Sequence, residues 1–162
     1  MRRASTLVAM AAGALVLAVG PATAASPHFI NASASGPTSS GTLNVKFKEA
    51  GLGDNVTITY RASADSTATY ACINHGGNHP QASNKETVNG PVSQTGTFSS
   101  GKNGSITATL TLSPPSAGSF SCPGNQRLVL AAVSYSDVAV SDTTNGIAAT
   151  IPGIFSATFF AV

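Results

Sequence analysis

A strict two-residue alternation runs through residues 42–48, which read Thr-Leu-Asn-Val-Lys-Phe-Lys. Leu43, Val45 and Phe47 fall on one side of an extended chain, because successive side chains of a strand point to opposite faces. Asn44, Lys46 and Lys48, which point to the other side, are polar. The pattern predicts a half-buried β-strand in a sheet with one face on a hydrophobic core.

Similar stretches recur along the chain. They predict strands within residues 56–61, 69–73, 97–99, 105–112, 128–140 and 154–160, with residues 26–40 as a leader or the start of an edge strand. Asp65-Ser66 is expected to interrupt one strand, and residues 74–94 are expected to be irregular. Residues 100–104 contain Asn-Gly, which suits a tight hairpin turn between the neighbouring strands.

The apolar alternation in residues 128–140 shifts phase near Ser136 and Asp137, which indicates a bulge or a bend. Residues 142–146 read as a turn. No segment has a helical period, so the sequence predicts an all-β domain. The fold class is an antiparallel immunoglobulin-like β-sandwich of about seven strands with one disulfide.

The first 25 residues have the three parts of a secretory signal peptide. Arg2 and Arg3 precede the apolar run 7–19, and small residues follow at 22–25, so cleavage after Ala24 or Ala25 is expected. The 13-residue run would span only about 20 Å as a helix, too short for a membrane. We therefore expect a signal peptide at 1–25, one domain at 26–162, no membrane span after signal removal, and a secreted, extracellular protein.

Composition excludes several classes of protein. Only 9% of the residues are charged while 42% are hydrophobic, which does not fit a disordered chain. Two of the eight Lys and Arg residues belong to the predicted signal, so the remainder balances six cations against six acids. No excess of basic residues is left for nucleic acid, and no nucleic-acid partner is expected.

Cys72 and Cys122 are the two cysteines of the chain. In an exported protein we expect them to form a disulfide, joining two distant strands and thereby the two sheets. A bridge that closes a loop of about 50 residues stabilises the fold by roughly 4 kcal/mol in the chain-entropy model.

The most suggestive cluster lies just after Cys72. As a binding loop we predict residues within 74–85, namely Asn74, His75, Gly76, Gly77, Asn78, His79 and Lys85. His75 and His79 are possible Cu²⁺ or Zn²⁺ ligands, but two histidines are too few for a closed site. We therefore predict no metal and no cofactor.

Familiar catalytic motifs are absent from the sequence, including G-x-S-x-G and H-E-x-x-H. A carboxylate pair for hydrolysis could lie among the six acids. Asp54, Asp65 and Asp142, however, occur in turn contexts, where Asp side chains accept hydrogen bonds from backbone N–H groups. We expect no enzyme and no catalytic residues.

Several segments together resemble a group of small exported actinomycete proteins without an established activity. The segments are Cys72-Ile-Asn-His-Gly-Gly-Asn-His-Pro80, Ser113-Pro-Pro115, Cys122-Pro-Gly-Asn-Gln126, Val133-Ser-Tyr-Ser-Asp-Val138 and Asp142-Thr-Thr-Asn-Gly146. The resemblance implies a shared fold and a shared bridge, and it supplies no catalytic residues.

The leading hypothesis is thus a non-enzymatic secreted protein that binds an extracellular partner or associates with the cell envelope. The first alternative is a small-ligand carrier with a cleft between its sheets. The second, weaker alternative is an extracellular hydrolase with dispersed acids.

Overall fold

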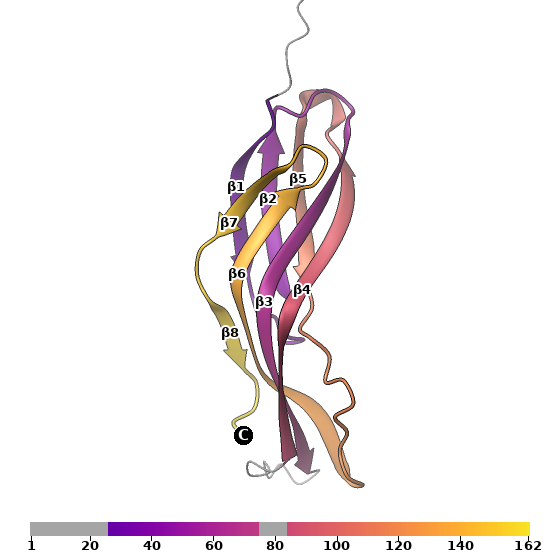
Figure 1. Cartoon of the computed structure of the whole chain (residues 1–162), viewed down its shortest axis with the longest axis vertical. Coiled ribbons are helices and arrows are strands. Elements are labelled where there is room, and N and C mark those ends of the chain that lie inside the picture. Colours follow the sequence, from indigo (N-terminus) through magenta and orange to yellow (C-terminus); the bar gives the residue numbers. More distant parts are fainter. Residues whose placement is uncertain (1–25, 75–83) are drawn as a thin grey trace, which may run out of the picture.

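A computed structural model of the chain describes residues 26–74 and 84–162. The predicted signal peptide lies outside the described residues. The described chain is nearly all β-structure, in two antiparallel sheets that form a sandwich (Figure 1). The predicted all-β sandwich with one disulfide is confirmed.

The smaller sheet has the strand order β1-β2-β5, with β1 at His28–Ser35, β2 at Leu43–Ala50 and β5 at Ser105–Leu112. The alternation predicted for β2 is confirmed. Leu43, Val45 and Phe47 are completely buried, while Lys46 and Lys48 are not, because the inward face packs on the second sheet.

The larger sheet has the order β4-β3-β6-β7, and β8 also pairs with β6. Its strands are β3 at Thr57–Asn74, β4 at Lys85–Ser99, β6 at Gln126–Asp142, β7 at Ile147–Ile151 and β8 at Phe155–Thr158. The described residues thus form eight strands, against about seven predicted. The predicted strands 56–61 and 69–73 merge into β3, the leader segment supplies β1, and β7 is new because its short run of Ile, Ala and Thr gave little signal.

The predicted interruption at Asp65-Ser66 is wrong, since β3 continues through it. Asp65 pairs with Pro91 of β4 and Ser136 of β6. Ser66 is buried, and its hydroxyl donates a hydrogen bond to the Ser134 carbonyl at 3.1 Å. Polar residues can lie within a continuous strand when the neighbouring strands supply hydrogen-bond partners for their buried groups.

The prediction that residues 74–94 are irregular is also wrong for its second half, which belongs to β4. The stretch contains Gly90 and Pro91, two residue types that are depleted in strands. Proline is tolerated on an edge strand, where one row of backbone groups faces outward. In the described sheets β4 lies at such an edge, and its pairing with β3 runs without a register shift from Lys85 to Ser99.

The expected hairpin at residues 100–104 is instead a crossing between the sheets. A short 3-10 turn, η2 at Gly101–Asn103, leads from β4 of the larger sheet to β5 of the smaller one. The Ser100 hydroxyl, which is buried, donates to the Gly53 carbonyl at 2.6 Å and accepts from the Val56 N–H at 2.9 Å. These bonds hold the crossing against the β2–β3 connection.

The predicted bulge in β6 is confirmed. Ser63 of β3 pairs with Ala139 of β6, whereas Asp65 pairs with Ser136, so β6 has one extra residue between the two pairs. The predicted turn at 142–146 is confirmed as well. It joins β6 to β7, and Gly146 takes a positive φ of 73° there.

The core lies between the sheets, where the partly buried rings of Phe29 and Phe98 pack against the buried rings of Phe47 and Tyr60. Towards the other end of the molecule, β3, β4 and β6 reach beyond the smaller sheet (Figure 1). Residues 113–125 lie against β3 there, with the Tyr70 hydroxyl donating to the Pro115 carbonyl at 2.6 Å.

Candidate functional site

The predicted binding loop begins and ends at the extended end of the β3–β4 pair. Asn74 is the last residue of β3, and Lys85 is the first of β4. The predicted loop residues His75, Gly76, Gly77, Asn78 and His79 lie outside the described residues. The structure therefore places the two ends of the loop and does not test the residues between them.

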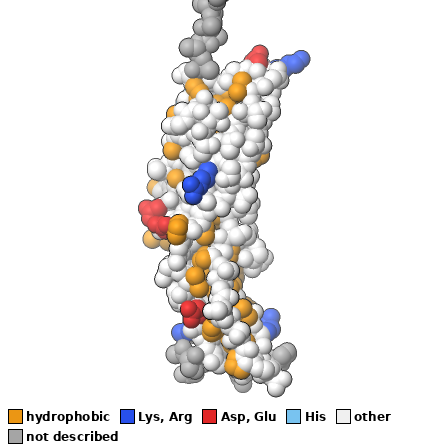
Figure 2. All heavy atoms as spheres, turned by 45° about the vertical axis from the view of Figure 1, so that its right-hand side comes forward, with side chains coloured by type: hydrophobic (Ala, Val, Ile, Leu, Met, Phe, Trp, Pro, Cys, Tyr) orange, Lys and Arg blue, Asp and Glu red, His pale blue; other side chains and the backbone are white. Residues whose placement is uncertain are grey.

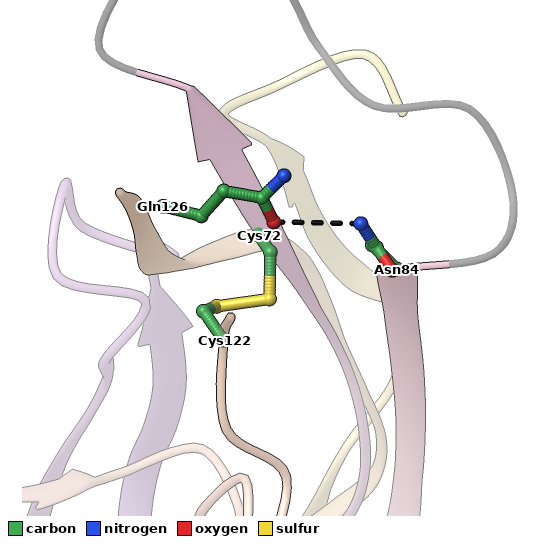
Figure 3. The surroundings of a disulfide bond; sticks show 4 residues. All are labelled: Cys72, Asn84, Cys122 and Gln126. Carbon is green, nitrogen blue, oxygen red and sulfur yellow. Dashed lines mark hydrogen bonds between the residues drawn. A yellow bond between two sulfur atoms is a disulfide. The ribbon is translucent and has the colours of Figure 1, made fainter. Parts of the chain in front are cut away.

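Both ends of this loop are tied to other parts of the molecule (Figure 3). The Asn84 side-chain amide donates to the Gln126 side-chain oxygen at 3.4 Å. The Lys85 ammonium donates to the Val162 carbonyl at 3.3 Å. Two residues before the end of β3, Cys72 is bonded to Cys122. The loop thus starts and ends on strands that the disulfide and these hydrogen bonds fasten to the rest of the molecule.

The disulfide between Cys72 and Cys122 confirms the predicted pairing, with a Cα–Cα distance of 5.5 Å. Its predicted placement is wrong. Cys72 lies in β3, but Cys122 lies in the β5–β6 connection, so the bridge fastens this connection to the larger sheet instead of joining the sheets. Since neither sulfur is a thiol, neither is available as a nucleophile or metal ligand.

The most extensive polar feature is the outward side of β3 and β4. We call it the hydroxyl face, and it consists of the odd-numbered residues 57–69 and 87–99. Ten of these fourteen residues are Ser or Thr, and only Arg61 and Asp65 are charged. Figure 2, turned so that the β4 side comes forward, shows few charged groups on that side of the molecule.

Cross-strand hydrogen bonds order the hydroxyl face. The Thr59 and Thr97 hydroxyls lie 3.2 Å apart, and those of Thr69 and Thr87 lie 3.3 Å apart. Between them the Thr67 hydroxyl donates to the Asn89 side chain at 2.7 Å. Such polar cross-strand pairs fix side-chain orientations along the sheet. The face is therefore a preorganised array of uncharged hydrogen-bonding groups.

The hydroxyl face was not predicted from the sequence, because residues 85–94 of β4 fall in the stretch expected to be irregular. The β3 half was visible in the alternation of Thr57, Ile58, Thr59 and Tyr60. The β4 half has Thr or Ser at alternate positions from Ser93 to Ser99. Extending this two-residue alternation from Ser93 back through Pro91 predicts the remaining residues of the β4 half, Asn89 and Thr87.

A second polar cluster lies inside the sandwich. Glu49 of β2 and Asp142 of β6 are 0% and 1% exposed, and Tyr60 of β3 is completely buried beside them. Neither Glu49 carboxylate oxygen has a hydrogen-bond partner among the described residues, and neither does the Tyr60 hydroxyl. An unpaired buried polar group costs free energy, so this cluster is the least satisfied part of the core.

Burial raises the pKa of Glu49 from 4.5 to about 7, and the nearby charge of Asp142 adds to the rise. The Tyr60 hydroxyl opposes it, from a position outside hydrogen-bond geometry. Burial likewise raises the pKa of the Tyr60 phenol, with Glu49 contributing. At neutral pH the Glu49 carboxyl is thus partly protonated.

Asp142 has the turn role that the sequence predicted for it. Its carboxylate accepts hydrogen bonds from the Thr144 and Asn145 backbone N–H groups at 2.8 and 2.9 Å. Asp54 lies in the β2–β3 turn, as predicted, whereas Asp65 lies in the middle of a strand. The buried carboxylates of Glu49 and Asp142 are closed off by the core, so neither faces a substrate.

Among residues 26–74 and 84–162, no cluster of three or more His, Cys, Asp or Glu side chains is suited to a metal ion. In the same residues no helix has the length and apolar character needed to cross a membrane. His28 is exposed, with its Nδ1 2.8 Å from the Ser26 carbonyl oxygen.

Comparisons with known proteins give no relative from which to transfer a role. No family model matches the chain, and neither does any curated protein or any solved structure.

Proposed function

We propose that the chain is a secreted, non-enzymatic binding domain that associates with the cell envelope through its hydroxyl face. The observation that supports this proposal is the ordered array of uncharged hydroxyl and amide groups along β3 and β4. A regular array of donors and acceptors suits contact with a repetitive, uncharged, hydrogen-bonding polymer surface. It contains no nucleophile paired with a base, which favours binding over catalysis.

The disulfide supports an extracellular place of work. Structural disulfides persist in oxidising compartments and are rare in the cytosol. Cys72 is buried, and the bridge closes a loop with a sequence separation of 50 residues. It therefore stabilises the part of the larger sheet that the smaller sheet does not cover.

The test is co-sedimentation of the purified mature protein with envelope isolated from the producing cells. Thr59→Val, Thr67→Val and Thr69→Val combined remove three hydroxyls from the face while keeping side-chain volume. We expect the wild type to sediment with the envelope and this variant to remain in the supernatant. Far-UV circular dichroism and thermal melting of the variant establish that it is folded.

The matched control makes the same change on the smaller sheet. Thr107, Thr109 and Thr111 are exposed on the outer side of β5, and their combined change to Val should leave sedimentation unaltered. A wild type that stays in the supernatant, or equal losses in both triple variants, would refute the hydroxyl face as the binding surface.

A further inference from the structure

Strand β6 has a gap along the edge where β7 and β8 pair with it. β7 pairs with residues 138–142 of β6, and β8 pairs with residues 132–135. Ser136 and Asp137 lie between these two ranges, so neither β7 nor β8 covers them. Figure 1 shows the chain bowing away from β6 between β7 and β8.

The β6 bulge lies in this gap. Asp137 is the extra residue, and it adopts a φ of 51°, which is uncommon for a residue other than glycine. Bulges often re-aim a side chain beside a functional site. Here the bulge places an exposed carboxylate at the uncovered part of β6.

An open pocket of about 460 Å³ occupies the same place. Its apolar lining comes from Val138 and Ile151 and from the β7–β8 connection, which contributes Pro152 and Ile154. Ile154 is 75% exposed, so its side chain is open to a ligand that enters the pocket. The volume is in the range typical of sites for small organic ligands.

The charge beside this pocket is negative and uncompensated. Asp137 lines it, and Asp65 is the cross-strand partner of the adjacent Ser136. Neither carboxylate forms an ion pair within the described residues. The nearest cation on the same side of β3, Arg61, donates to the Ser93 hydroxyl of β4 and is thus turned away from β6.

We infer that this pocket binds a small organic cation, an ammonium group on a short apolar body. The carboxylate of Asp137 would receive the ammonium, and the walls of Ile151, Pro152 and Ile154 would bury the apolar part. A neutral ligand would leave the charge unused, and an anion would be repelled by both acids. The site lies away from the β4 edge of the hydroxyl face and does not depend on the envelope-binding proposal.

This site fits the small-ligand alternative raised by the sequence, but at a different place. The expected cleft between the sheets is occupied by core side chains such as Phe47, Tyr60 and Tyr135. The pocket is instead at the edge of β6, where a ligand can enter from solvent.

The experiment is a titration of the ¹⁵N-labelled mature protein, followed by NMR, with hexylammonium, hexanol and hexanoate. Hexylammonium should give saturable shifts at residues 136–138 and 150–154. Hexanol and hexanoate should bind about tenfold more weakly, which corresponds to about 1.4 kcal/mol for the carboxylate–ammonium contact near the protein surface. Added salt should weaken hexylammonium binding.

Asp137→Asn removes the charge and keeps a residue type that tolerates positive φ. It should weaken hexylammonium binding about tenfold, while Asp54→Asn, the same change in a distant turn, should leave it unchanged. Ile154→Ser should weaken hexylammonium and hexanol together, because it removes a wall that both ligands use.

Three outcomes would overturn the assignment. The first is hexanol binding as tightly as hexylammonium, and the second is an equal loss of binding in Asp137→Asn and Asp54→Asn. The third is self-association of the wild type that Ile154→Ser abolishes, because it would assign the pocket to a second copy of the chain.

Discussion

Glu49 and Asp142 are carboxylates from opposite sheets that meet inside the sandwich, both shielded from water. Asp142 accepts three hydrogen bonds from the turn that follows it, whereas Glu49 accepts none from the described residues. Two neighbouring carboxyl groups in a region of low dielectric cannot both ionise cheaply. Glu49, which has no partner among the described residues, has its pKa raised to about 7 by burial and by the nearby charge of Asp142.

This relationship predicts how stability depends on pH. The pKa of Glu49 is raised from 4.5 to about 7 on folding, so the folded state binds the proton more tightly than the unfolded state. Its contribution is complete below about pH 4.5, falls as the pH rises to about 7, and then levels off. The loss is on the order of 3 kcal/mol.

Urea unfolding of the wild type and Glu49→Gln at pH 4.5, 6 and 8 measures this contribution. The free energy of unfolding should fall more steeply with pH in the wild type than in the variant, which has no proton to lose at this position. Glu86→Gln, an exposed change on β4, should keep the wild-type profile. Parallel profiles for the wild type and Glu49→Gln would contradict the buried, protonated carboxyl.

Ser100 should be the most sensitive serine of the crossing between the sheets. Ser100→Ala removes the acceptor of the Val56 N–H and the donor to the Gly53 carbonyl, and leaves both backbone groups unpaired. We expect a loss of about 1–3 kcal/mol in unfolding free energy by urea titration. Ser99→Ala, next to it and exposed, should stay within about 0.5 kcal/mol of the wild type. Equal losses in both would mean that these bonds contribute little.

At the bulge residue Asp137, the effect of a substitution on stability should depend on whether the new residue tolerates the backbone conformation. At a φ of 51°, a β-branched side chain is strained, whereas Asn and Gly are tolerated. Asp137→Val should lower the unfolding free energy by about 1–3 kcal/mol, and Asp137→Gly should not. Thermal melting of the two variants tests this, and a Val variant as stable as the Gly variant would argue against the bulge.

The disulfide should matter most for the part of the larger sheet beyond the smaller one. Cys72→Ala with Cys122→Ala frees residues 113–125, and should weaken the contact between the Tyr70 hydroxyl and the Pro115 carbonyl. In the chain-entropy model the loss is roughly 4 kcal/mol, which lowers the melting temperature by on the order of 10 °C. The same loss should follow reduction of the wild type. Equal melting with and without reductant would contradict a structural bridge.

The strands with a clear period of two were predictable from sequence, and so was the β6 bulge. Residues 42–48 and 105–112 show the period directly, and the phase slip at Ser136 and Asp137 reports the extra residue. The end of β4 was predicted, but its residues 85–94 were not, because Gly90-Pro91 breaks the local signal and the edge position that tolerates this proline is a property of the whole sheet.

The buried acid pair could have been found by extending the inward period. Glu49 follows Leu43, Val45 and Phe47 at intervals of two, and Asp142 follows Val138 and Val140 in the same way. Acidic side chains are rarely buried, so the period alone gave no reason to expect these two in the core. The pocket beside Asp137 could not have been predicted, since it depends on where β7 and β8 pair with β6.

The central claim is that the uncharged hydroxyl and amide groups of the hydroxyl face bind the envelope, and its most direct test is an affinity measured at low and high salt. Binding of the wild type to isolated envelope should be nearly the same at about 0.05 M and at about 0.5 M NaCl, because salt does not screen hydrogen bonds between uncharged groups. It should be lost in the Thr59, Thr67 and Thr69 triple valine variant under both conditions. Binding that disappears at high salt, or that survives in the triple variant, would contradict the account.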